Sequence, residues 1–441
     1  MRMPLVWELT NELKDFMTPT KLRAINAERA EGSLPEEVCQ FYDRLHGDPN
    51  LHYEQIIHEV QTAKIRDRSR KNPYHTLALQ LTRLVNLILY LKHKNNAAVI
   101  AHAARWYQGL KSIADIARPL WVFSLNHDIC TELICDAHNI AWSNGVPDEP
   151  IEFLQTNRPG SVRLAFNRIP REAFNENHGF GSDGVNLLKL HGAIDLFIAN
   201  EKQDILYVPR GDRIGILERI YELSGYLGRD GEKIVPLGEL ALADLEGEMQ
   251  FLQPTLLTGH KFEAGFQQHA PPEFLDVFTR KIESFNEFVA IGYSFGDDHI
   301  NRIVTAWLAR GESRKVFVVD PGGRAPKCLA HASNQVTLLP QKAVDFLAEQ
   351  GGYSLSSADR YLRTVYGELR DSKKYTEERV HQLIDPTARM KRLAQRLVAL
   401  VRSGVLKEGI SDTEIRKIAE NVENELMHEA EQDFLAKIKA T

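Results

Sequence analysis

Histidine, asparagine and glycine occur in this chain at points where apolar runs end, and each type suits a particular chemical step. His191 carries an imidazole, which titrates near neutral pH and suits a general base. Asn126 offers a polar amide that can place a water molecule. Gly292 lets backbone approach a phosphate closely, and the helix predicted after it presents an N-terminus that favours anions. These types would suit a site that binds a phosphate-bearing compound and activates water.

Each of these residues stands beside a short apolar run that predicts a β-strand. Three of the four runs end in polar clusters, at residues 126–128, 292–294 and 320–322. The other, "VNLLKLHGAIDLFIA", is predicted to be a strand broken at Gly192. Wholly apolar strands that alternate with helices are typical of a parallel sheet covered on both faces, and ligands bind beyond the carboxyl ends of its strands. The sequence therefore predicts an α/β fold with the candidate residues at one edge of the sheet.

The segments around these strands are predicted from periodicity and composition. Residues 4 to about 118 are mostly helical, with apolar residues four apart on one face, such as Leu9 and Leu13. Residues 145–185 are rich in Gly, Pro and Asn, which favours a loop or a variable insertion. Residues 201–275 mix short strand and loop pieces.

The C-terminal region, residues 341–441, is predicted to be helical and carries many charges of both signs. Ser411 and Glu414 have the spacing of a capping box before an apolar helix face. Two interpretations stay open for this region. It is either a surface for oligomerisation or a partner, or a helical hairpin packed on its own domain.

Composition limits the class of protein. The chain has 441 residues, of which 43% are hydrophobic and 26% charged, as in a globular protein of two or three domains. Its net charge of -6 gives no overall basic field for nucleic acid. The longest strongly apolar stretch, residues 84–91, is too short to span a membrane, and no signal peptide is expected. Four scattered cysteines, with no CxxC pair, predict reduced thiols in a cytoplasmic protein.

In chain order, "SLNHD", "KLHGAID", "IGYSFGDDHIN" and "VFVVDPGG" resemble the motifs of the SIR2-like family. The resemblance is closer to the bacterial branch that degrades NAD in antiviral defence than to the protein-deacetylating sirtuins. It covers roughly residues 3 to 325. It implies a Rossmann-like parallel sheet in residues 1–340, with a large helical insertion at about 15–118 and a helical region at 341–441.

The resemblance also implies a role for each candidate residue. Among the catalytic residues, Asn126 would hold the nicotinamide ribose and a water, Asp128 would orient the site, and His191 would be the general base. The cofactor-binding residues would be Gly292, Tyr293, Ser294, Asp297 and Asp320. NAD would be the substrate, and no metal is expected. Cleavage of the nicotinamide–ribose bond passes through an oxocarbenium-like sugar, and its leaving group is already cationic, so a base and a placed water suffice.

Each candidate also has a purely structural interpretation. A helix-capping role is open for Asn126 and for Asp297 or Asp298, and Asp128 could be a cap or a structural hydrogen-bond acceptor. His191 could be a satisfied core histidine, and residues 320–323 could be a plain turn. His127 and His299 are expected to be solvated.

Two features differ from the family pattern. Residues 193–291 contain no cysteine, so the four-cysteine zinc module of sirtuin deacylases is not supported, which favours free NAD as the substrate. The family's first strand and its Gly-Ala-Gly-x-Ser loop, which cradles the diphosphate, are missing before "MRMPLVWELTNEL". A missing strand would leave unpaired backbone groups and an apolar slot in the sheet. Three explanations are open: a start codon assigned too late, a decayed gene copy, or a slot filled by a partner chain or another segment.

The leading hypothesis is therefore that the protein is an NAD+ hydrolase, which releases nicotinamide and ADP-ribose and acts as a toxic effector of antiphage defence. One alternative is a catalytically weak or inert nucleotide-binding module within a defence complex, and another is a zinc-free protein deacylase. A homo-oligomer is expected. The resemblance also suggests an ATPase or nucleic-acid-sensing partner protein.

Overall fold

The computed structural model describes most of the first 363 residues of the chain. The described residues are 6–27, 34–66, 73–155, 162–175, 177–199, 203–211, 213–223, 240–255, 271–357, 359–360 and 362–363. The chain divides into two compact units, residues 1–347 and 348–441, and the first contains every candidate site residue. Residues 364–441 lie outside the described residues, and with them the predicted C-terminal helices and the capping box at Ser411 and Glu414.

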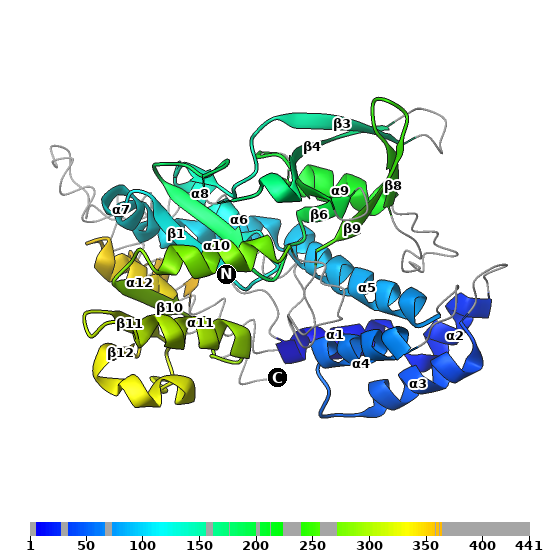
Figure 1. Ribbon diagram of the computed structural model, residues 1–441, viewed down its shortest axis with the longest axis horizontal. Helices are drawn as coiled ribbons and strands as arrows, with labels where there is room; N and C mark the ends of the chain where they lie inside the picture. The colour runs from blue at the N-terminus through cyan, green and yellow to red at the C-terminus, as the bar shows by residue number, and fades with distance from the viewer. Residues whose placement is uncertain are drawn as a thin grey trace, which may run out of the picture. The chain divides into compact units, whose positions relative to one another are not determined.

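A group of helices forms the N-terminal part of the first unit (Figure 1). Its members are α1 Val6–Phe16, α2 Pro19–Ala27, α3 Glu36–Gly47, α4 Tyr53–Arg66, α5 Pro73–Asn95, α6 Ala97–Ala104, η1 Arg105–Tyr107 and α7 Gly109–Ile116. These spans confirm the helical prediction for this region. In the described residues, no helix is long and apolar enough to cross a membrane.

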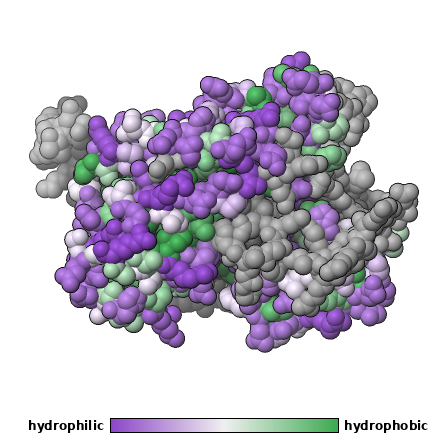
Figure 2. Space-filling model, viewed as in Figure 1, coloured by the Kyte–Doolittle hydropathy of each residue, from purple (hydrophilic) through white to green (hydrophobic). Residues whose placement is uncertain are grey.

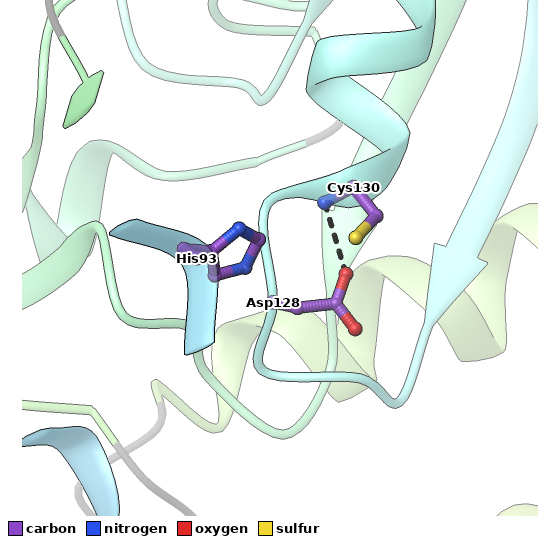
Figure 3. A group of neighbouring side chains, drawn as sticks. All are labelled: His93, Asp128 and Cys130. Carbon is purple, nitrogen blue, oxygen red and sulfur yellow. Dashed lines mark hydrogen bonds between the residues drawn. The ribbon is translucent and has the colours of Figure 1, made fainter. Parts of the chain in front are cut away.

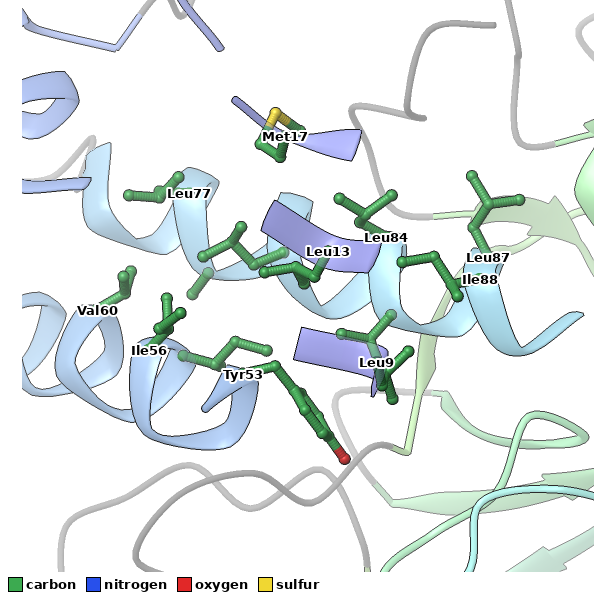
Figure 4. Packing of buried hydrophobic residues seen from close by; sticks show 14 of the residues in the cluster. Leu9, Leu13, Met17, Tyr53, Ile56, Val60, Leu77, Leu84, Leu87 and Ile88 are labelled. Atoms are coloured by element: carbon green, nitrogen blue, oxygen red, sulfur yellow. The ribbon is translucent and has the colours of Figure 1, made fainter. Parts of the chain in front are cut away.

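Apolar residues spaced three and four apart give these helices a shared core. Leu9 and Leu13 of α1, Ile56 of α4, and Leu84 and Ile88 of α5 all lie in one hydrophobic cluster (Figure 4). Each of the five is at most 3% exposed. Because burying a side chain of this size stabilises a fold by about 1.5–3 kcal/mol, this core fixes α5 against its neighbours.

Two three-stranded parallel sheets take the place of the single parallel sheet that the sequence predicts. The first has the strand order β1-β5-β2 and the second β10-β11-β12. The strands are β1 Leu120–Ser124, β5 Val185–Lys189, β2 Trp142–Ser143, β10 Glu287–Ile291, β11 Lys315–Val319 and β12 Val336–Leu339. Strand β5 is buried along its whole length, which suits an apolar strand covered on both faces. The α/β class and the parallel pairing are confirmed.

The remaining helices lie between the strands along the chain or follow them (Figure 1). They are α8 Cys130–Ala137, η2 Arg171–Ala173, α9 Arg213–Leu223, α10 Glu273–Ile282, α11 Asp298–Leu308, η4 Lys327–Gln335 and α12 Ala343–Gln350. Helix α10 lies on the first sheet, where the ring of Phe278 is 4.6 Å from the ring of Phe123 in β1.

A closed antiparallel barrel is the part of the fold that the sequence does not predict. Its strand order is β3-β4-β7-β6-β9-β8. The strands are β3 Pro150–Gln155, β4 Val162–Pro170, β7 Asp204–Tyr207, β6 Leu196–Ala199, β9 Met249–Pro254 and β8 Leu240–Ala243. The loop alternative for 145–185 is wrong at 150–155 and 162–170, because Phe153 in β3, and Leu164 and Phe166 in β4, alternate into the barrel core.

The predicted strand at "VNLLKLHGAIDLFIA" is in fact two strands in different sheets. Its first half is β5 of the parallel sheet, and its second half is β6 of the barrel. Gly192, where the sequence suggested a break, has a φ of 77°, in the left-handed region that favours glycine. The turn at this residue therefore carries the chain from one sheet to the other.

Candidate active site

His191 lies at the carboxyl edge of the first sheet, two residues after β5. Its side chain is buried, and its Nε2 lies 3.3 Å from Nε2 of His299 and 3.8 Å from Oδ1 of Asp297. Asp297 and His299 stand at the start of α11, which follows β10 of the second sheet. The structure therefore brings together residues that follow strands of both sheets.

His299 and His127 were expected to be solvated, and that prediction is wrong. They are only 7% and 8% exposed, respectively. The ring centroid of His127 is 6.4 Å from that of His191, and its Nδ1 lies 3.3 Å from the carbonyl oxygen of Gly192. The sequence around His299 is polar, and only Ile300, the first buried apolar residue of α11, signals that this turn faces the interior.

The barrel holds the turn that carries His191. Thr255, which directly follows β9, is fully buried, and a Cβ atom at Gly192 would overlap its carbonyl oxygen. The Thr255 hydroxyl accepts a hydrogen bond from the Ala193 N–H at 3.3 Å and donates one to the Leu196 carbonyl at 3.0 Å. Only glycine fits at 192, so close packing against the barrel fixes the backbone beside the imidazole.

A buried lysine fixes the loop between β1 and α8. Lys189, the last residue of β5, donates a hydrogen bond to the carbonyl oxygen of Asp128 and forms an ion pair with Glu132 Oε1 at 3.1 Å. Burial alone would lower the pKa of Lys189, but the Glu132, Asp128 and Asp195 carboxylates outweigh it and raise that pKa. Lys189 therefore stays charged. A lysine inside the apolar run "VNLLKL" was the sequence signal for such a partner.

The two predicted catalytic residues in this loop differ in their surroundings. Oδ1 of Asp128 accepts a hydrogen bond from the Cys130 N–H at 2.9 Å, which is the structural role that the sequence left open for it. Asn126 is exposed, and its N–H donates to Ser124 Oγ at 3.2 Å. The N-cap position of α8 belongs to Ile129, so Asn126 does not occupy it.

His93, Asp128 and Cys130 form a group whose ligand-capable atoms all lie within 4.8 Å of one another (Figure 3). Nε2 of His93 accepts a hydrogen bond from the Ile129 N–H at 3.2 Å, and Asp128 accepts the Cys130 N–H. Burial and the Asp128 carboxylate raise the pKa of the Cys130 thiol well above its usual range. These contacts give the group a structural role at the start of α8.

The turn after β10 is held from within. The Tyr293 hydroxyl lies 3.0 Å from Asn301 Oδ1 and accepts a hydrogen bond from the Asp297 N–H at 3.3 Å. Burial and the Asp297 carboxylate raise the pKa of Tyr293. Tyr293 is therefore a support of the turn. Gly292 and Ser294 are exposed, and a Cβ atom at Gly292 would meet nothing within 4 Å.

Asp297 stands at the N-cap position of α11, yet its side chain makes no capping hydrogen bond. Its Oδ1 instead lies 3.8 Å from Nε2 of His191. Together with burial and Glu54, Asp297 raises the pKa of Tyr53, the first residue of α4. The N-terminal helices therefore border the site.

Asp320 follows β11 and is partly buried. Its carbonyl oxygen accepts a hydrogen bond from the Gly323 N–H at 2.9 Å, and Gly323 has a φ of 59°. This is the plain turn that the sequence left as an alternative. No contact given by the structure joins Asp320 to the histidines.

The arrangement offers a buried imidazole pair with a carboxylate beside it. Such a group can hold a proton and pass it between nitrogen atoms. A ring nitrogen of His191, a carboxylate oxygen of Asp297 and a ring nitrogen of His299 also lie within 4.8 Å of one another, and these are ligand types that a divalent metal accepts. No protein-family model matches the chain, and no curated protein matches it.

Proposed function

We propose that this protein is an NAD+ hydrolase that cleaves the nicotinamide–ribose bond and releases nicotinamide and ADP-ribose. The observation that carries the proposal is the burial of His191 beside Asp297 and His299, where strands of both parallel sheets end. The ordered motifs that resemble the SIR2-like family support NAD as the substrate. Parallel sheets with helices against them agree with a Rossmann-like fold, which is part of the same proposal.

The imidazole pair suggests how His191 would act as the base. Two neutral imidazoles whose Nε2 atoms lie 3.3 Å apart share one N–H between these atoms. When His191 donates that N–H to His299, the other nitrogen of His191 carries the lone pair of a base. It takes a proton from water, and the water oxygen forms a bond to the ribose carbon. Nicotinamide leaves with the electron pair of the broken bond and becomes neutral.

Asp297 would support this step electrostatically. Its Oδ1 lies 3.8 Å from Nε2 of His191, so its negative charge stabilises the imidazolium that forms when His191 takes a proton. The exposed Asn126 would place the ribose and the water at the mouth of the site. The exposed backbone of Gly292 and the hydroxyl of Ser294 would face the phosphates, and Asp320 the adenosine end.

The test is nicotinamide release from NAD by the purified chain, measured by chromatography. His191→Ala should lower the rate by about 10²- to 10⁴-fold, the usual contribution of a general base. His331→Ala removes an exposed histidine and is the matched control, so its rate should equal that of the unchanged chain. Equal rates for His191→Ala and the unchanged chain would contradict the proposal.

A second candidate is a nucleotide-binding module with little or no catalysis. It is favoured by β1 and β10, each of which has a pairing partner on one side only in the described part of the chain. This candidate predicts that NAD binds without release of nicotinamide and that His191→Ala leaves the binding unchanged. Calorimetric titration with NAD, run beside the release assay, separates the two.

In its wider form the proposal describes a toxic effector of antiphage defence in the cytoplasm. Hydrolysis of NAD harms the cell that makes the hydrolase, so the activity has to be inhibited until infection. A homo-oligomer, or a partner that is an ATPase or senses nucleic acid, would supply that control. The support for this is the resemblance of the motifs to the defence branch of the SIR2-like family.

A further inference from the structure

Two imidazoles and a carboxylate meet where strands of both parallel sheets end, and their atoms are spaced like the ligands of a tetrahedral metal ion. Nε2 of His191 lies 3.3 Å from Nε2 of His299 and 3.8 Å from Oδ1 of Asp297. One ligand atom of each residue lies within 4.8 Å of those of the other two. Zinc bonds of about 2.0–2.2 Å at tetrahedral angles place neighbouring ligand atoms about 3.3 Å apart. The first distance equals this spacing, and the second is slightly longer.

The two imidazole rings turn their Nε2 atoms toward each other. The ring centroids of His191 and His299 lie 5.4 Å apart, whereas the two Nε2 atoms are only 3.3 Å apart. The lone pair of a neutral imidazole nitrogen lies in the plane of its ring and points away from the ring centre. The two nitrogens are therefore directed at a common region, where they accept either one shared proton or one metal ion.

Backbone contacts hold the three side chains in place. His191 lies on the turn that packs against the barrel. Asp297 and His299 stand at the start of α11, where the Asn301 N–H donates to the Asp297 carbonyl at 2.9 Å. Nδ2 of Asn301 also donates to the Phe295 carbonyl at 2.9 Å, which fixes the loop before the helix. A metal site needs this kind of support, because its ligands have to be in position before the ion arrives.

Burial distinguishes these side chains from the polar residues of the surface. The described part of the face in Figure 2 is mostly hydrophilic, and water competes there for any ion that a single exposed side chain attracts. The side chain of His191 is 3% exposed and His299 is 7% exposed, so these two ligands are largely shielded from water. The side chain of Asp297 is 21% exposed, which gives an ion a path from solvent and a water molecule as its fourth ligand.

The ligand types and their spacing indicate which ion fits. Two imidazole nitrogens and one carboxylate oxygen suit Zn²⁺, whereas Mg²⁺ and Ca²⁺ prefer oxygen ligands. An octahedral ion with bonds of about 2.1 Å needs neighbouring ligand atoms about 3.0 Å apart. Both distances from Nε2 of His191 are longer than that, so the spacing favours a tetrahedral ion.

We propose that His191, Asp297 and His299 form a site for one Zn²⁺ ion, and that the bound ion prevents His191 from acting as a base. The bond to the metal uses the lone pair of His191 Nε2, so the neutral ring carries its proton on Nδ1. Nδ1 is the nitrogen that takes a proton from water in the proposed hydrolysis, and a protonated Nδ1 has no lone pair for this step. The site rests on the geometry alone, whereas its effect on catalysis rests on the proposed function.

Another group among the described residues has metal-ligand types within the same distance. It consists of His93, Asp128 and Cys130 (Figure 3). There, the backbone N–H groups of Ile129 and Cys130 donate to Nε2 of His93 and to Oδ1 of Asp128. In the group at His191, the distances of 3.3 and 3.8 Å join the ligand atoms to one another. Zinc is therefore assigned to the His191 group, and Cys130→Ser is the matched control.

Calorimetric titration of the full chain with Zn²⁺, after treatment with a chelator, tests the site without using enzyme activity. One ion per chain should bind. His299→Ala and Asp297→Asn should each weaken this binding by about 100-fold or more, since a lost ligand costs at least as much as a lost outer partner. Cys130→Ser and His331→Ala should bind Zn²⁺ as tightly as the unchanged chain. Co²⁺ in place of Zn²⁺ should show the visible absorption of a tetrahedral ion.

Circular dichroism checks that each variant is folded. Asp297→Asn keeps the shape of a partly exposed side chain, so it tests the site even where His299→Ala does not fold. Three results would overturn the site. They are no binding of Zn²⁺ by the unchanged chain, equal affinity in the unchanged chain and both ligand variants, and a loss of affinity in Cys130→Ser alone.

The effect on catalysis is a separate measurement. Zn²⁺ at about ten times its dissociation constant should lower nicotinamide release from NAD about tenfold, and a chelator should restore the rate. Release that continues unchanged while the site is filled would overturn the blocking of His191. Zinc binding that the ligand variants lose, in a chain that releases no nicotinamide with or without chelator, would confirm the site and contradict the hydrolase. The two proposals therefore fail separately.

Discussion

At the scale of single residues, a buried histidine outside the proposed catalytic group holds the start of α8. His93, near the end of α5, is 1% exposed, and its Nε2 accepts the Ile129 N–H. Burial lowers the pKa of His93 to about 4. The neutral ring is therefore the form that the folded state requires.

This pKa predicts a loss of stability in mild acid. The unfolded chain takes up a proton at His93 near pH 6.5, and the folded state does so only near pH 4. The folded state is thus favoured fully above pH 6.5, and the contribution falls as the pH drops to 4. The shift corresponds to about 3 kcal/mol. Urea unfolding at a series of pH values between 7 and 4 measures the loss.

His93→Gln is the matched variant, because its amide oxygen can accept the Ile129 N–H and does not titrate. Carboxylates also titrate in this range, so the informative quantity is the difference between the two proteins at each pH. The free energy of unfolding should fall less steeply with acid in His93→Gln. Parallel curves for the two proteins would show that His93 is not the group responsible.

At the scale of elements, Lys189 joins β5 to the loop and helix that follow β1. Lys189→Met should lower the free energy of unfolding by about 3–5 kcal/mol, because it leaves the buried Glu132 carboxylate without its cation. Thermal and urea unfolding measure the change. Adding Glu132→Gln to this variant removes the stranded charge and should recover part of the loss. Losses that simply add in the double variant would mean that the two side chains act independently.

The elements that the sequence predicts well are those with one strong local signal. The apolar runs that became β1, β10 and β11 stand out because they are short and mostly apolar, and the N-terminal helices because their apolar residues recur at helical spacing. The barrel was missed because the Gly, Pro and Asn residues of 145–185 favour a loop. Which strands pair there depends on contacts between distant segments.

The parts of the candidate site that follow a strand were predictable, because the ends of the apolar runs are a local signal in the sequence. Strand ends located His191 and Asp297 on one edge, and the structure brings these two together. Burial of His299 was missed, because it depends on how α11 packs and not on the residues next to it. The roles of His93 and Thr255 were missed too, since α5 and β9 reach the site only through the tertiary fold.

At the scale of the whole molecule, one unit combines three kinds of structure around the histidines. The N-terminal helices contribute Tyr53 and His93, the parallel sheets contribute His191 and Asp297, and the barrel contributes Thr255. None of the three could be removed without exposing part of the site. We therefore expect the first unit to unfold in one cooperative step, with the histidines and the barrel losing structure together.

The overlap of position 192 with Thr255 makes the junction of barrel and sheet intolerant of change. Gly192→Ala should lower the free energy of unfolding by about 3 kcal/mol or more. The new Cβ atom would overlap the carbonyl oxygen of Thr255, so the backbone at residue 192 or at residue 255 would have to move. Gly211→Ala, at a φ of 91° with nothing within 4 Å, carries only the conformational cost of about 1–2 kcal/mol. In a saturation library selected for soluble expression, position 192 should then remain glycine in nearly every survivor. Position 211 should accept asparagine and aspartate as well as glycine. The pattern of accepted residues would therefore mark position 192 as the place where the barrel and the first parallel sheet are joined.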